Sequence, residues 1–312
     1  MAPQHVLALI PLPVATRAAL AARHVLHEGA AGPQDRPAPV HTPVTAVVTN
    51  GTTGLSAAQM DRLPALRLVC AFGVGYEGID LAAARARGIT VANAPDTNGE
   101  TVADHAFGLL LALARGYAPL TAAVRAGGWD GARAARPTLH GATLGILGMG
   151  SVGGAIARRA LGFAMQVRYH GRRARPELPY IYDADVVGLA RASDFLVACC
   201  PGGAATRHLV NADVLTALGP QGFVVNVARG SVVDTAALIA ALQAGTLGGA
   251  GLDVLDTEPE VPAALHAFDN VLITPHMAGR SPAAQAAQTA ALLASLDAFF
   301  AGRPPASVVA AT

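Results

Sequence analysis

The chain has 312 residues, of which 52% are hydrophobic and 14% charged, and its formal net charge is +1. A near-neutral charge without a large basic cluster argues against binding to nucleic acid or to a membrane surface, and no apolar run reaches the roughly 18 residues of a membrane span. The three cysteines, Cys70, Cys199 and Cys200, form neither a disulfide framework nor a metal-binding spacing, so we expect a cytoplasmic protein without a metal site.

The first part of the chain alternates short β-rich runs with alanine-rich helical runs, a pattern typical of a parallel sheet covered on both faces. Strands are expected at residues 6–10, 46–49, 68–72 and 90–92. Helices are expected at residues 16–27, 56–63 and 81–87. A loop or extended connection is indicated by four prolines, Pro33, Pro37, Pro39 and Pro43.

Two helices are expected in the middle of the chain. The run Thr97-Asn98-Gly99-Glu100 matches a capping box, and an apolar stretch follows it as far as residue 114. A second helix is expected over residues 119–126. Because the first helix is apolar nearly all round, we expect it to be buried between domains or between the subunits of a homodimer.

A glycine-rich run then follows the apolar strand expected at residues 143–147. A dinucleotide-binding fingerprint requires a G-x-G-x-x-G run that follows a strand and precedes a helix. Here the helix is expected over residues 152–161. The glycines permit a tight turn, close approach of a pyrophosphate and packing of helix on strand. The residues of the expected site are Gly148, Met149, Gly150, Ser151, Val152 and Gly153.

The rest of the chain continues the same alternation. Further strands are expected at residues 166–169, 195–199, 223–226, 249–253 and 271–274, which makes a sheet of six. A last helix over residues 282–300 is expected to return to the first half. The predicted domains are therefore residues 1–98 with 283–312, and residues 99–282.

The turn after the second of these six strands bears on the choice of cofactor. An NAD-binding site has an acidic residue about 20 positions after the glycines. Here the turn reads His170-Gly171-Arg172-Arg173, and Arg172 lies 19 positions after Gly153. Two guanidinium groups suit a 2′-phosphate, so we expect NADP(H) to be preferred, with NAD(H) possible. The alternative is a solvated basic turn without a ligand.

Three polar residues each follow the end of an expected strand, where open α/β sheets bind ligands. They are Arg229, Glu258 and His276. Taken singly, each has an ordinary structural interpretation, as a surface arginine, a helix start or a loop cap. Together, in this order, they indicate a catalytic set.

These motifs, with the turn at residues 73–80, the Asn93-Ala94-Pro95 run and the Val102-Ala103-Asp104 run, resemble the D-2-hydroxyacid dehydrogenase family over nearly the whole chain. The resemblance implies an α/β protein with two doubly wound parallel-sheet domains. One would be a flavodoxin-like substrate domain and the other a Rossmann NAD(P)-binding domain, with a cleft between them.

The resemblance also implies roles for the catalytic set. Arg229 would bind the substrate carboxylate and polarise the keto oxygen, and His276 would be the general acid. Glu258 would orient the imidazole and favour its protonated form.

Further contacts are implied by the same resemblance. The substrate carboxylate would be bound by the backbone N–H groups of Val74 and Gly75, near Thr52 and Thr53. The remaining cofactor contacts would come from Thr101, Cys200, Pro201, Thr206, Val227, Ala228, Asp253 and Gly279.

The basic turn and the loop at residues 50–54 are most similar to NADP-preferring glyoxylate/hydroxypyruvate reductases and their hydroxyphenylpyruvate-reducing relatives. This implies NADPH-dependent reduction of glyoxylate or hydroxypyruvate to the D-2-hydroxyacid. Residues 130–140 lack bulky aromatic side chains, and Trp129 lies just upstream, so substrate size stays open. The alternatives are an arylpyruvate reductase, a phosphonate dehydrogenase, or a non-enzymatic NAD(P)-sensing protein of the corepressor type.

Overall fold

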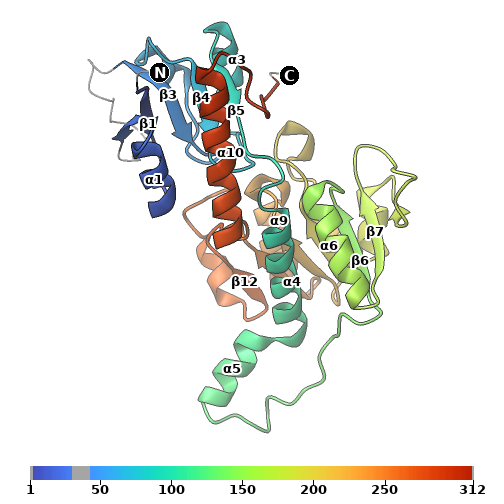
Figure 1. Ribbon diagram of the computed structural model, residues 1–312. Coiled ribbons are helices and arrows are strands. Elements are labelled where there is room, and N and C mark those ends of the chain that lie inside the picture. The colour runs from blue at the N-terminus through green and yellow to red at the C-terminus, as the bar shows by residue number, and fades with distance from the viewer. Residues whose placement is uncertain (1–2, 30–42, 311–312) are drawn as a thin grey trace. The chain divides into compact units, whose positions relative to one another are not determined.

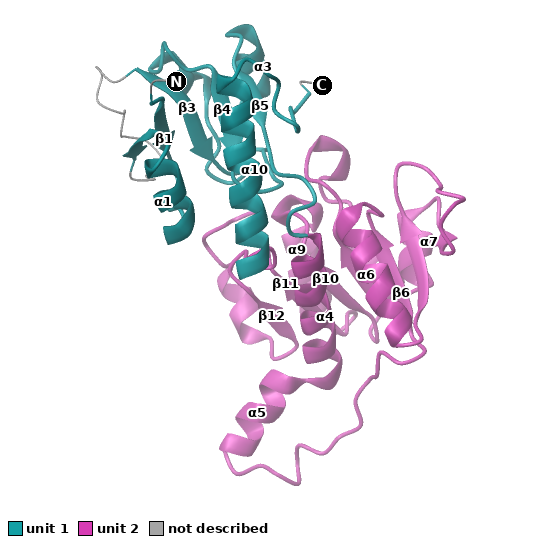
Figure 2. Ribbon diagram, viewed as in Figure 1, with its two compact units in different colours: residues 1–98, 281–312 teal, residues 99–280 magenta. Residues whose placement is uncertain are grey.

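The computed structural model describes residues 3–29 and 43–310, whose course is drawn in Figure 1. They form two compact units, coloured in Figure 2: unit 1 comprises residues 1–98 and 281–312, and unit 2 comprises residues 99–280. Each unit contains one parallel sheet, which confirms the α/β prediction. Most of the expected proline-rich connection lies outside the described residues.

Unit 1 contains a five-stranded sheet with the order β2-β1-β3-β4-β5, in which every neighbouring pair is parallel. This is the flavodoxin-like order expected for the first domain. Because β3 and β4 are covered on both faces, nearly all of their residues are buried and apolar. The strands are β1 His5–Ala8, β2 Val25–Glu28, β3 Val44–Thr49, β4 Leu68–Ala71 and β5 Thr90–Ala92.

The helices of unit 1 come from both ends of the chain. They are α1 Val14–Ala21, α2 Ala57–Asp61, α3 Leu81–Ala86 and α10 Pro282–Phe300. The side chain of Ser281 caps α10 by accepting a hydrogen bond from the Ala284 N–H. Leu292 and Leu296 of α10 are buried in one cluster with Leu68, so the C-terminal helix belongs to unit 1.

The prediction of one helix over residues 16–27 is wrong at its C-terminal end. Helix α1 ends at Ala21, and Val25–Glu28 forms the edge strand β2. Val25 and Leu26 suit a strand, and β2 pairs in register with β1. Four residues show too little alternation to be separated from the preceding helical pattern.

Unit 2 contains a seven-stranded parallel sheet with the order β12-β11-β10-β9-β6-β7-β8. The two-residue edge strand β8 was not expected, because two residues carry no periodicity. The strands are β6 Thr143–Leu147, β7 Gln166–His170, β8 Ile181–Tyr182, β9 Phe195–Ala198, β10 Phe223–Asn226, β11 Gly249–Leu252 and β12 Val271–Ile273.

The helices of unit 2 are α4 Gly99–Arg115, α5 Tyr117–Arg125, α6 Ser151–Gly162, α7 Val186–Arg191, α8 Ala212–Leu218 and α9 Thr235–Gln243. All of them except α5, which has no buried residue, pack on one or the other face of the sheet. Short 3₁₀ helices lie at Ala204–Thr206, Gly230–Val232 and Ala263–Ala267. No single helix in the described ranges is long and apolar enough to cross a bilayer. Helices α4 and α5, which are bent by 53° relative to each other, reach the length and apolar composition of a membrane span only when they are taken together.

Helix α4 differs from its prediction in two ways. It is apolar on the face that packs within unit 2, but Glu100 and Asp104 are exposed and pair with Arg158 and Arg159 of α6. The expected capping box is also wrong. The helix begins at Gly99, and the Thr97 hydroxyl donates instead to the carbonyl of Ala94 at 2.8 Å. Because Glu100 is held by the arginines, it serves as an ion-pair partner of α6.

Candidate active site

His276 lies in the loop that follows β12, in a backbone conformation that side chains rarely adopt, with φ at +50°. Its backbone N–H donates to the carbonyl of Asp253 at 2.8 Å, which holds this conformation. Its Nδ1 donates to Oε2 of Glu258, also at 2.8 Å. Strain of this kind persists where the surrounding structure fixes it, and it is concentrated at functional sites.

Glu258 lies in the loop after β11, and both of its carboxylate oxygens are used. Oε1 accepts the Leu255 N–H at 2.9 Å, and Oε2 accepts from His276. Burial raises the pKa of this carboxyl group, but the hydrogen bonds from His276 and Leu255 and the charge of Arg229 outweigh it. The pKa of Glu258 is therefore lowered, so the group is a carboxylate near neutral pH.

Arg229 follows the end of β10, in a turn that a buried asparagine holds. The Asn226 side chain donates from Nδ2 to the carbonyl of Arg229 and accepts the Ala228 N–H at Oδ1, each at 3.0 Å. A methyl group on Gly230 would lie 1.9 Å from the carbonyl carbon of Leu255, so only glycine lets the two loops approach. Arg229 thereby lies near enough to Glu258 to lower the pKa of that carboxyl group. Unit 2 thus brings together all three residues of the predicted catalytic set.

Asp253, one of the expected cofactor contacts, is 2% exposed. Its carboxylate accepts hydrogen bonds from the Thr274 hydroxyl at 2.6 Å and from the backbone N–H groups of Met277 and Ala278, each at 2.9 Å. These bonds anchor the loop that carries His276. Sequence reasoning missed this anchoring role, and no sequence pattern pointed to the buried Asn226 side chain either.

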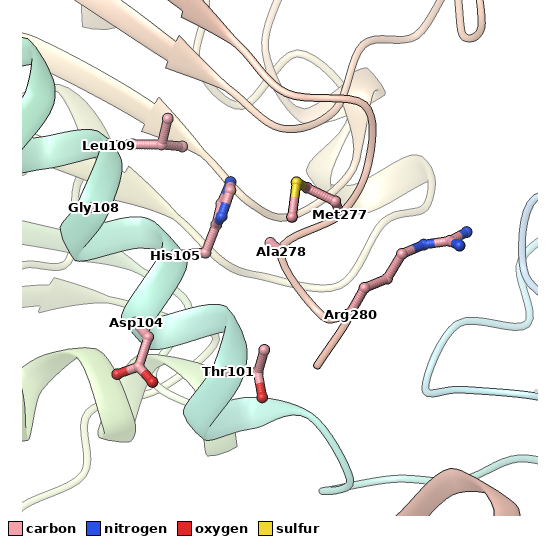
Figure 3. A pocket seen from close by; sticks show the side chains of 8 residues that line it. All are labelled: Thr101, Asp104, His105, Gly108, Leu109, Met277, Ala278 and Arg280. Carbon is pink, nitrogen blue, oxygen red and sulfur yellow. The ribbon is translucent and has the colours of Figure 1, made fainter. Parts of the chain in front are cut away.

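A cavity of about 400 Å³ borders the same loop on its α4 side. Figure 3 shows α4 on one side of the cavity and the loop after β12 on the other. None of the three catalytic candidates lines it. His105, one of the lining residues, lies 3.0 Å from the Thr274 hydroxyl and 3.5 Å from the Asp253 carboxylate, so one wall of the cavity contacts the residues that anchor the loop of His276.

The glycine-rich loop has the form that a pyrophosphate requires. Gly148 has φ at +101°, and a methyl group on Gly153 would lie 2.1 Å from the Gly148 carbonyl oxygen, so helix α6 packs closely on the turn. Gly150 is the N-cap of α6, and no side chain caps the helix there. No atom lies within 4 Å of the position of a methyl group on Gly150. The first turn of α6 is therefore open to an anion, and the loop fits a dinucleotide.

The basic turn after β7 is held by hydrogen bonds between predicted cofactor residues and three residues that the sequence did not single out, Asp183, Tyr182 and Arg175. Nδ1 of His170 donates to the Asp183 carbonyl at 2.9 Å, and the Tyr182 hydroxyl donates to the Gly171 carbonyl at 3.3 Å. Arg175 donates from Nη1 to the Met149 carbonyl at 2.9 Å, which joins the turn to the glycine-rich loop.

Arg172 and Arg173 are both exposed, and no hydrogen bond or ion pair holds either side chain within the described ranges, although the charge of Arg173 helps to lower the pKa of Glu177. Two exposed guanidinium groups fit a phosphate group. The solvated basic turn remains the alternative interpretation.

The other predicted cofactor residues also lie in unit 2. Cys200 packs against the first turn, 2.7 Å from the position of a methyl group on Gly148, and burial raises the pKa of its thiol to about 11. The Thr206 hydroxyl donates to the Pro201 carbonyl at 2.7 Å. The remaining members of the predicted set in this unit are Thr101, Val227, Ala228 and Gly279.

The four predicted substrate residues lie in unit 1, on two adjoining loops. The backbone N–H groups of Thr52 and Thr53 donate to Oδ1 of Asn50, at 3.1 and 2.7 Å. A methyl group on Gly51 would lie 2.8 Å from the carbonyl carbon of Gly75, so the loops touch. Val74 is 36% exposed. The structure therefore places the two threonines beside the Val74–Gly75 turn.

The chain is similar to known proteins over most of its length. The family model for the D-isomer specific 2-hydroxyacid dehydrogenase, NAD binding domain, matches residues 107–278. A glyoxylate/hydroxypyruvate reductase A of Arabidopsis thaliana is 40% identical over 261 residues, covering 83% of each chain. A hydroxyphenylpyruvate reductase of Plectranthus scutellarioides is 39% identical over 262 residues, covering 84% of each.

Solved structures show the same similarity. The NADPH-dependent glyoxylate/hydroxypyruvate reductase of Sinorhizobium meliloti, in complex with NADP and malonate, superposes with a TM-score of 0.90 at 39% identity. The match covers 99% of this chain and 97% of that one.

Proposed function

Since the chain belongs to the family of D-isomer-specific 2-hydroxyacid dehydrogenases, we propose that it reduces a small 2-oxoacid to the D-2-hydroxyacid with NADPH. Glyoxylate and hydroxypyruvate are the leading substrates. The observation that carries the proposal is the His276–Glu258 pair beside Arg229. The names of the relatives support the substrate class.

The proposed mechanism assigns one task to each side chain. Arg229 binds the substrate carboxylate and polarises the keto oxygen, because its planar fork can donate to both groups. His276 gives the proton on Nε2 to the keto oxygen, while Glu258 holds Nδ1 and stabilises the positive charge. When bound, the nicotinamide supplies the hydride that the keto carbon accepts.

The binding residues follow from the same proposal. The backbone N–H groups of Val74 and Gly75 anchor the substrate carboxylate, and Thr52 and Thr53 on the adjoining loop contact the same small molecule. The glycine-rich loop holds the pyrophosphate, and Arg172 with Arg173 holds the 2′-phosphate, so NADP(H) is preferred and NAD(H) is used less well.

We propose a homodimer on the strength of α5 and the segment that follows it. None of the residues of α5 is buried, and Tyr117, Val124 and Trp129 expose 54%, 43% and 66% of their surfaces. Exposed apolar side chains gathered in one segment are typical of a surface that another chain covers. A cytoplasmic location is also part of the proposal, since the three cysteines form no disulfide.

The first experiment measures initial rates of NADPH and NADH oxidation with glyoxylate, hydroxypyruvate and phenylpyruvate. Fast oxidation of NADPH with a small oxoacid supports the proposal. Preference for phenylpyruvate would favour the arylpyruvate reductase, which the hydroxyphenylpyruvate reductase relative makes the second candidate. No turnover by protein that binds NADPH would contradict both.

A further inference from the structure

Residues 166–185 carry four arginines and three acids, and each acid has a partner. Glu177 pairs with Arg175 at 2.7 Å. Asp185 caps helix α7 by accepting the Gly188 N–H at 2.7 Å. Asp183 pairs with Arg168. The charge of Arg173 also acts on Glu177 and helps to lower the pKa of that carboxyl group, so within the described ranges Arg172 is the cation of this segment without a partner. With four arginines against three acids, the field around the turn is positive.

Asp183 occupies an unexpected position. It follows the edge strand β8, its backbone N–H donates to the Tyr169 carbonyl at 2.9 Å, and its carbonyl accepts from Nδ1 of His170. Its backbone therefore lies directly beside the end of β7. This is the place where an NAD-binding site holds the acid that hydrogen-bonds the ribose. An acidic residue on the neighbouring strand therefore lies next to this place, although β7 itself ends without one.

The Asp183 carboxylate is occupied by a bidentate ion pair. Arg168 donates to it from Nε at 2.9 Å and from Nη2 at 2.6 Å. The side chains expose only 22% and 14% of their surfaces, so water screens the pair weakly. A parallel fork of this kind is the strongest form of an arginine–carboxylate contact.

We infer that Arg168 is a specificity-determining residue for the cofactor, because it neutralises the carboxylate of Asp183, whose backbone is hydrogen-bonded to the end of β7, next to the basic turn proposed to bind the 2′-phosphate. The inference rests on the proposed binding of NADP(H). Without Arg168, the Asp183 carboxylate repels a 2′-phosphate and is free to accept the ribose hydroxyls of NAD(H). Like charges placed side by side weaken a complex strongly.

The test compares the wild-type chain with R168M, D183N and R168M/D183N, using Kd values for NADP+ and NAD+ from isothermal titration calorimetry. R168M should raise the Kd for NADP+ by about tenfold or more, while the Kd for NAD+ stays or falls. The double variant should restore the NADP+ value to within about threefold of wild type, because no carboxylate is left to repel the phosphate.

Two controls separate this role from a structural one. R159M removes an arginine that pairs with Glu100 and Asp104 of α4 and should leave the ratio of the two Kd values unchanged. Thermal unfolding of every variant reports the fold. If R168M keeps the wild-type ratio, or if the double variant binds NADP+ no better than R168M, the inference is overturned. If the wild-type chain itself prefers NAD+, the proposed cofactor preference fails instead.

Discussion

At the scale of single residues, the site depends on a histidine held in an unfavourable conformation. The φ of +50° at His276 costs free energy, on the order of 1–3 kcal/mol for a residue of this kind. The Asp253 carboxylate offsets that cost, since it binds the hydroxyl and two N–H groups of the surrounding loop. The conformation directs Nδ1 to Glu258 and leaves Nε2 for chemistry.

Replacing the proposed acid tests this arrangement directly. H276A should lower kcat about 10²–10⁴-fold, the usual contribution of a positioned acid, and leave the Kd for NADPH nearly unchanged. Single-turnover rates and fluorescence titration with NADPH measure the two quantities. A variant with near-normal turnover would remove His276 from the mechanism.

The lowered pKa of Glu258 predicts how the stability of the fold depends on pH. Its pKa in the folded chain lies below the ordinary 4.5, so its ionised form stabilises the fold above that pH. This contribution is lost as the pH falls through the folded pKa. E258Q lacks it, so the difference in Tm between wild type and E258Q should be largest near pH 7 and shrink below pH 4.5. A gap that grows on acidification would contradict the assigned direction.

At the scale of elements, the turn of Arg229 and the loop of Glu258 approach each other closely because residue 230 is a glycine. In G230A the new methyl group would lie 1.9 Å from the Leu255 carbonyl carbon and must push the Arg229 turn away from the loop of Glu258. We expect kcat/KM to fall about 10²-fold, with a stability loss of about 1–3 kcal/mol. The matched control is G131A, where no atom lies within 4 Å of the added methyl group.

The elements also show how far sequence reasoning reaches. Residues 282–300 and the central strands of both sheets were predicted closely, because their apolar patterns and caps are local signals. The strands β2 and β8 were missed, since only pairing with a neighbouring strand defines them. The ion pairs of Glu100 could not be predicted, because its arginine partners lie more than fifty residues away in the sequence.

Some residues of the candidate site could likewise be predicted from the sequence, and others could not. The Arg229, Glu258 and His276 set could be proposed from the sequence, because each residue follows a strand and parallel strands end at one edge. The anchoring roles of Asn226 and Asp253 could not, since they depend on hydrogen bonds to loops elsewhere in unit 2. The pairing of Arg168 with Asp183 depends on β8, which the sequence did not reveal.

At the scale of the whole molecule, the proposed homodimer is the prediction that an assembly measurement can settle. The V124D/W129A variant places a charge at one exposed apolar side chain of α5 and removes the indole of Trp129, which follows the helix. Sedimentation velocity should give a dimer for wild type and a monomer for the variant, because burying an unpaired carboxylate in an interface is costly. T121A, an exposed neighbour on α5, should stay dimeric. A monomeric wild type would contradict the proposal.

The return of α10 to unit 1 has a consequence for biosynthesis. Unit 2 is one continuous stretch and can fold as soon as it leaves the ribosome, but β4 must wait for α10, which is translated last. At about 5–20 residues per second, the delay is on the order of ten seconds or more. During that time the nascent first domain exposes the apolar face that Leu292 and Leu296 later cover, which makes it a natural substrate for chaperones that bind unfinished chains.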